Sequence, residues 1–116
     1  MNIQIVTDEI STDEVKEIAK EFYKTMIKGV VDIEQEIIVL GGEYHMDANV
    51  ILLEKGSKQK DIWGFNINID KPTDSDEWIE YISLINIRPL QNNKSMEIQD
   101  ENIRYKVKDI IKKKIK

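Results

Sequence analysis

The only histidine of this chain stands between two acidic residues, in the order Glu43-Tyr44-His45-Met46-Asp47. An imidazole beside carboxylates can transfer protons, or it can join carboxylate oxygens around a divalent cation. If this segment is an extended strand, alternate side chains lie on one face roughly 7 Å apart. Glu43, His45 and Asp47 would then form a single row.

Amide and guanidinium side chains occupy the polar positions of two later strand-like segments. Asparagine is a poor strand former, so its presence inside a predicted strand indicates a hydrogen-bonding role. Arg88 could hold a carboxylate or phosphate group. The candidate ligand-binding residues are therefore Glu43, His45, Asp47, Asn66, Asn86 and Arg88.

Three interpretations of this polar set stay open. The first is an ordinary solvated sheet face. The second is a divalent-cation site in which Glu43 or Glu34 adds an oxygen ligand to His45 and Asp47. The third is an acid–base site with His45 as the proton shuttle. His-x-Asp is a weak pattern, so no metal site is assigned. No serine lies in a recognisable nucleophile turn. The sequence therefore determines neither a cofactor nor whether the chain is an enzyme.

Composition further limits the classes of protein and of active site that are possible. The 116 residues suit one domain, 1–116, and the absence of cysteine excludes disulfides, a thiol nucleophile and thiolate metal sites. The longest apolar runs are too short to span a bilayer, and no secretion leader precedes the first strand-like segment. We therefore expect a cytoplasmic protein without a membrane partner.

The net charge of −5 hides a basic segment. Residues 104–116 carry a net charge of +6, and the rest of the chain carries −11. Basic residues at the end of a terminal helix complement the helix dipole, and the acidic remainder would repel phosphate. Nucleic acid is therefore not expected as a partner.

Periodicity predicts five strands and two helices. Ser11 and Glu14 form a capping box that starts a helix over 12–23, and Asp100 caps a final helix. Residues 26–40 fit either a helix or a strand, and their Val and Ile content favours a strand that ends in a Gly41-Gly42 hairpin turn. The other predicted strands are 2–6, 43–53, 62–69 and 78–88.

The predicted order is β-α-β-β-β-β-α. This order indicates an α+β domain with a mostly antiparallel sheet of about five strands and with both helices on one face. The other face would carry the polar candidate residues.

Several short motifs resemble those of a small prokaryotic family that is catalogued only as a domain of unknown function. The motifs are Gly41-Gly42-Glu43-x-His45-x-Asp47-Ala48, Gly56-Ser57-x-Gln59, Trp63-Gly64-x-Asn66 and Ile85-Asn86-Ile87-Arg88-Pro89. The resemblance covers about 30–96 and extends loosely to both ends. It implies a soluble prokaryotic protein, and it transfers no activity, cofactor or catalytic residue.

The leading hypothesis is a small cytoplasmic module that binds a small polar ligand or a protein partner on its polar sheet face. The alternative is a metal-assisted or histidine-based hydrolytic enzyme on the same face. A homodimer, paired along the long strand predicted over 78–88, is a further option.

Overall fold

Two long strands form the centre of the protein. In the computed structural model, which describes residues 1–116, β2 (Met26–Asp32) pairs antiparallel with β4 (Ile62–Asn68) along its whole length. The outer strands β1 (Gln4–Val6), β3 (Ile37–Leu40) and β5 (Ile79–Glu80) complete a five-stranded sheet in the order β1-β3-β2-β4-β5. All pairings are antiparallel, which confirms the α+β class and the five-stranded sheet.

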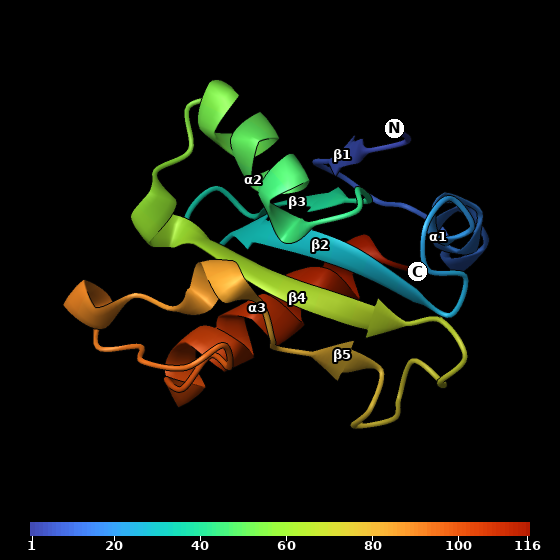
Figure 1. Ribbon diagram of the computed structural model, residues 1–116. Coiled ribbons are helices and arrows are strands. Elements are labelled where there is room, and N and C mark those ends of the chain that lie inside the picture. Colours follow the sequence, from blue (N-terminus) through green and yellow to red (C-terminus); the bar gives the residue numbers. More distant parts are fainter.

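One face of the sheet carries the larger core. Alternate residues of the central strands, such as Val31, Trp63 and Phe65, point to this face. They pack against α1 (Thr12–Ala19) and α3 (Glu101–Lys114), which lie on the same side of the sheet (Figure 1). The core of 19 buried residues holds these two helices to the sheet.

The opposite face is also covered. Helix α2 (His45–Glu54) lies across it and buries Ala48 and Leu52 against Val30, Val39 and Ile62. Figure 1 shows α2 and α3 on opposite sides of the sheet. The two predicted helices, α1 and α3, do share one face, but the prediction lacked α2, so the expectation of an open polar face is wrong. The observed order is β-α-β-β-α-β-β-α.

The strand predicted over 43–53 is helix α2. The Asp47 carboxylate accepts hydrogen bonds from the backbone amides of Glu43 and Tyr44, at 3.0 and 2.9 Å, and so fixes the first turn. The helix was missed because its outward side is apolar as well: Met46, Val50 and Leu53 are exposed. A helix with apolar residues all round shows no 3.6-residue period.

Residues 26–40 are extended as predicted, but they form two strands rather than one. The turn between β2 and β3 is organised by the buried Asp32 carboxylate, which accepts from the amides of Glu34 and Gln35 at 2.9 and 3.0 Å. Gly41 and Gly42 have positive φ values of 113° and 97° and lead from β3 into α2. The predicted hairpin turn at these glycines is therefore wrong.

The long strand predicted over 78–88 ends after β5. Ser83 then caps a short 3₁₀ helix, Leu84–Asn86, through a hydrogen bond to the Ile85 amide. The Asn86 side chain accepts from the Gly64 amide at 2.8 Å and donates to the Gly64 carbonyl at 3.0 Å. One carboxamide thus satisfies the β4 backbone where a paired strand would do so, and the long edge proposed for a dimer does not exist.

The predicted helix starts are confirmed. Ser11 accepts from the Glu14 amide at 3.1 Å, and Asp100 accepts from the amides of Asn102 and Ile103. The first helix ends at Ala19 rather than Tyr23. The C-terminal end is held beside α1, because Ile115 pairs with Ile10.

Candidate functional site

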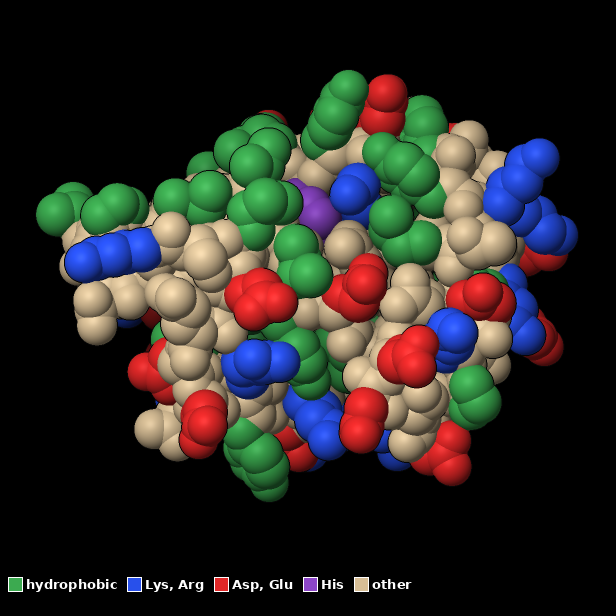
Figure 2. Space-filling model, turned by 60° about the horizontal axis from the view of Figure 1, so that its bottom comes forward, with side chains coloured by type: hydrophobic (Ala, Val, Ile, Leu, Met, Phe, Trp, Pro, Cys, Tyr) green, Lys and Arg blue, Asp and Glu red, His purple; other side chains and the backbone are tan.

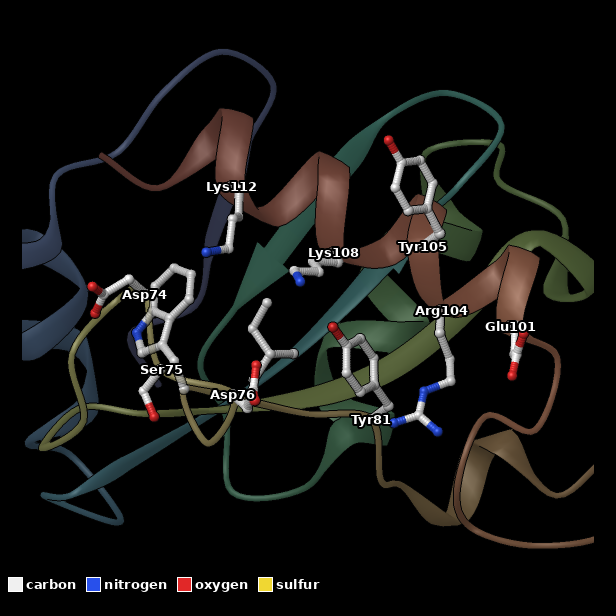
Figure 3. Close-up of a pocket in the computed structure, with 11 residues that line it drawn as sticks. Asp74, Ser75, Asp76, Tyr81, Glu101, Arg104, Tyr105, Lys108 and Lys112 are labelled. Atoms are coloured by element: carbon white, nitrogen blue, oxygen red, sulfur yellow. The ribbon is translucent and has the colours of Figure 1, made fainter.

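Two pockets of similar size lie on opposite sides of the sheet. The first, which we call the α3 groove, has a volume of about 460 Å³ and lies between α3 and the segment around β5. Figure 3 shows Arg104, Lys108 and Lys112 of α3 on one side, with Asp74 and Asp76 on the other. These charged side chains are all exposed to solvent. The groove therefore needs no ligand to satisfy its polar groups.

The second pocket has a volume of about 490 Å³ and lies between α2, the central strands and the segment after β5. We call it the His45 pocket. Figure 2 shows the histidine in a hollow among hydrophobic side chains. The lining residues are Lys28, Tyr44, His45, Met46, Asn66, Ile82, Ser83, Leu84, Ile85 and Met96. Apolar walls around a few buried polar groups are typical of ligand sites.

Three strands place a row of unlike polar groups at this site. Lys28 of β2 is the direct cross-strand partner of Asn66 in β4, and Asn66 is the partner of Glu80 in β5. Direct partners project from the same face of a sheet, with Cβ atoms about 5 Å apart. The row thus presents an ammonium, a carboxamide and a carboxylate in that order.

Asn66 is the unusual member of the row. It is 8% exposed, and its Oδ1 atom is buried without any hydrogen-bond partner. Leaving a buried acceptor unpaired costs about 1–3 kcal/mol. The other buried asparagines nearby, Asn49 and Asn86, are hydrogen-bonded. Asn66 therefore has a hydrogen-bonding capacity that the fold does not use.

His45 is neutral at physiological pH. Its Nε2 atom lies 2.8 Å from the Phe65 carbonyl oxygen, which can only accept, so Nε2 carries the proton and Nδ1 is an acceptor. Burial, with a smaller contribution from the charge of Lys28, lowers the pKa of His45 to about 4. The hydrogen bond to the Phe65 carbonyl and a weaker polar contact with the Asn66 side chain, whose geometry does not make it a hydrogen bond, raise this pKa without cancelling the shift.

The family comparison matches almost the whole chain. Residues 4–114 fit the model of the family described as "Protein of unknown function (DUF5674)". The chain belongs to this family. The predicted resemblance to a family of unknown function is thereby confirmed, over 4–114. No curated protein and no solved structure matches the chain.

Of the six predicted site residues, the structure brings His45 and Asn66 together in the pocket. Glu43 and Asp47 do not form the predicted row with His45, because His45 and Asp47 lie in the first turn of α2 and Glu43 precedes this helix, so none of them is on a strand. The Asp47 carboxylate caps the helix, and the Glu43 carbonyl accepts from the Tyr23 hydroxyl at 2.5 Å. Whether any of the six contacts a ligand stays a prediction.

Asn86 and Arg88 lie outside the pocket lining and hold the segment after β5 to β4. The Arg88 guanidinium donates to the carbonyls of Ile85, Gln59 and Ile62 and to the Gln91 side chain. It also lies 4.3 Å from the centre of the Trp63 ring. Burial lowers the pKa of Arg88 to about 10, so the group stays charged at neutral pH. Each nitrogen of this guanidinium already donates to a protein oxygen.

Lys28 was not singled out from the sequence, although it lines the pocket. The available signal was a single charge within the otherwise apolar run Met26-Ile27-Lys28-Gly29-Val30-Val31 of β2. The apolar pocket residues after β5 were missed because that segment was predicted to be a strand. No three His, Asp or Glu side chains gather into a group that could hold a metal ion. The helices include none with the length and apolar character that crossing a bilayer requires.

The neutral state of buried His45 predicts an acid-sensitive fold. Its pKa is about 4 in the folded protein and near the ordinary 6.5 in the unfolded chain. The unfolded chain therefore binds more protons below pH 6.5, and the free energy of unfolding falls as the pH drops from about 6.5 to about 4. We expect His45 to account for a loss of about 3 kcal/mol over this window, measured by urea unfolding.

The control is His45→Gln, which keeps a side-chain N–H for the Phe65 carbonyl and does not titrate. This variant should lose distinctly less stability over the same pH range. An identical pH dependence in both proteins would contradict the assignment of the effect to His45.

Arg88 should be a stability residue. Arg88→Lys removes the planar donors that reach several carbonyls at once, so it should lower the free energy of unfolding by about 2 kcal/mol. The matched change Arg104→Lys, at an exposed position, should cost less than about 0.5 kcal/mol. Equal stabilities of the Arg88→Lys and native proteins would instead favour a ligand role for Arg88.

Proposed function

We propose that this protein is a binding module for a small ligand, and that the His45 pocket is the binding site. The observation that carries the proposal is the Asn66 carboxamide, whose buried oxygen has no partner within the protein. A buried polar group that destabilises the fold is expected where it serves function. We further propose a cytoplasmic location in a prokaryote, which follows from the sequence expectation alone.

The chemistry of the pocket suits a ligand with an apolar body and a polar head. Ile82, Leu84, Ile85 and Met96 supply apolar contacts, while Asn66 and neutral His45 supply acceptors on the opposite side. The head must therefore contain an N–H or O–H donor. Such a ligand would enter from the surface, because Leu84 and Met96 are partly exposed at the mouth.

Hydrolysis is the weaker alternative on the same residues. The imidazole Nε2 bonds to a backbone carbonyl rather than to a carboxylate that would orient it as a base. Ser83 is buried, and its hydroxyl accepts from the Ile85 amide. The geometry therefore favours binding over acid–base catalysis.

Replacement of Asn66 tests the binding function. Asn66→Leu removes an unpaired polar group from a buried position, so it should raise the free energy of unfolding by about 1 kcal/mol. It should also abolish binding of 4-methylpentanamide, a neutral probe with an apolar body and an N–H donor. Binding is measured by NMR titration of the backbone amides of the pocket residues.

The control for this variant is Asn86→Leu. Asn86 makes three hydrogen bonds, to both backbone groups of Gly64 and to the Met96 carbonyl, so its loss should cost about 3 kcal/mol or more. If Asn66→Leu is destabilising to the same degree, Asn66 is structural. If the native protein shows no saturable shifts with this or any other small ligand that joins an apolar body to an N–H donor, the proposed function fails.

A second candidate function is association through the apolar surface beside the pocket mouth. The exposed side of α2 carries Met46, Val50 and Leu53, and Leu84, Ile87 and Leu90 are also exposed. Grouped apolar residues on a surface mark contacts with other proteins. A second copy of the chain is the simplest partner to test.

Light scattering at micromolar concentration should give a mass above that of one chain. The double variant Val50→Lys, Leu53→Lys should return the protein to the mass of a single chain, because two charges on this face oppose burial. A single-chain mass for the native protein at every concentration would exclude self-association.

A further inference from the structure

The polar row beside the His45 pocket has charged groups at both ends that lack ion-pair partners. None of the four ion pairs of the protein includes Lys28 or Glu80. Burial lowers the pKa of Lys28, and the charge of Glu80 only opposes this shift. A partly desolvated ammonium without a close counter-ion gains stability from an anion placed beside it.

The middle of the row requires a hydrogen-bond donor from the ligand rather than an anion. The Asn66 Oδ1 atom is an unpartnered acceptor, and the Nδ1 atom of neutral His45 is also an acceptor. Both can be satisfied only by N–H or O–H donors. The site thus favours an anion at Lys28 and a hydrogen-bond donor at Asn66, and these two residues are direct partners on neighbouring strands.

The remaining walls define the third part of the ligand. Ile82, Leu84, Ile85 and Met96 surround the space beside the row, and the cavity of about 490 Å³ has room for a molecule of several heavy atoms beyond the polar head. These side chains offer apolar contacts and no charge. An aliphatic group is therefore the natural occupant of this part.

We propose that the pocket binds an α-amino acid unit with an aliphatic side chain. Its carboxylate lies at Lys28, its N–H donates to Asn66, and its side chain packs against the apolar walls. The unit is either a free amino acid or the last residue of a peptide, since both carry a carboxylate next to an N–H. This inference rests on the proposed function of the same pocket.

Four probes separate the parts of this chemistry. L-leucine and N-acetyl-L-leucine carry both head groups, N-acetyl-L-leucinamide lacks the carboxylate, and 4-methylpentanoate lacks the N–H. In NMR titrations, L-leucine or N-acetyl-L-leucine should bind at least about tenfold more tightly than either incomplete analogue. Tighter binding of L-leucine identifies a free amino acid as the source, and tighter binding of N-acetyl-L-leucine identifies a peptide terminus.

Variants assign each head group to a residue. Lys28→Met should weaken the better complete probe at least about tenfold and leave N-acetyl-L-leucinamide within about twofold of its native affinity. Lys28→Arg keeps the charge and should retain most of the affinity. Lys55→Met, at the exposed end of α2, controls for the loss of one positive charge. The amide spectrum of each variant shows that it is folded.

Two results overturn the inference. One is an incomplete analogue that binds as tightly as the complete probes, and the other is an unchanged affinity in Lys28→Met. If 4-methylpentanamide still binds in either case, the pocket remains a binding site and only the ligand class is wrong. If neither it nor any of the four probes binds, the proposed function fails together with the inference.

Discussion

The pairing of β2 with β4 is the constraint on which the rest of the structure depends. These strands lie at the centre of the sheet, and helices cover both of their faces. A polar side chain that is buried on the α2 side is therefore withdrawn from water, and it destabilises the fold unless it finds a partner inside the protein. Asp32 shows the usual outcome. Burial raises the pKa of its carboxyl, but four hydrogen bonds from Ser57, Gln35 and Glu34 outweigh this effect and leave the pKa below its ordinary value.

The segment after β5 shows how the same sheet is completed with little regular structure. Side chains of Asn86 and Arg88 bond to β4 backbone groups that a longer neighbouring strand would otherwise pair. Asn93 supports this segment by donating to the carbonyls of Asn86, Ser95 and Glu97. The polar residues of this region thus maintain the wall that carries Ile82, Leu84 and Ile85 into the pocket.

The sequence predicted those parts of the fold that depend on local signals. Capping residues located the starts of both predicted helices, and the alternation of Ile62–Ile69 predicted β4. The predictions for two elements were wrong for physical reasons. The apolar outer side of α2 removed its helical period, and the extended pattern of 78–88 reflects burial of single residues such as Trp78 and Asn86 rather than ladder pairing.

The site was predicted only in part for the same reasons. His45 and Asn66 were selected because a lone histidine and a strand asparagine are chemically unusual, and both line the pocket. Their meeting depends on a helix that was predicted as a strand, so the neighbours of His45 could not be foreseen. Lys28 required the register between β2 and β4, which periodicity alone does not specify.

The row formed by Lys28, Asn66 and Glu80 has a direction, since its two ends carry opposite charges. The apolar walls lie to one side of this direction and the sheet lies beneath it, so the surroundings of the hollow have no mirror symmetry. A molecule that contacts two groups of the row and the apolar walls is held at three chemically different points. Its mirror image can satisfy only two of them at once, and the hollow therefore distinguishes left-handed from right-handed forms of a chiral molecule.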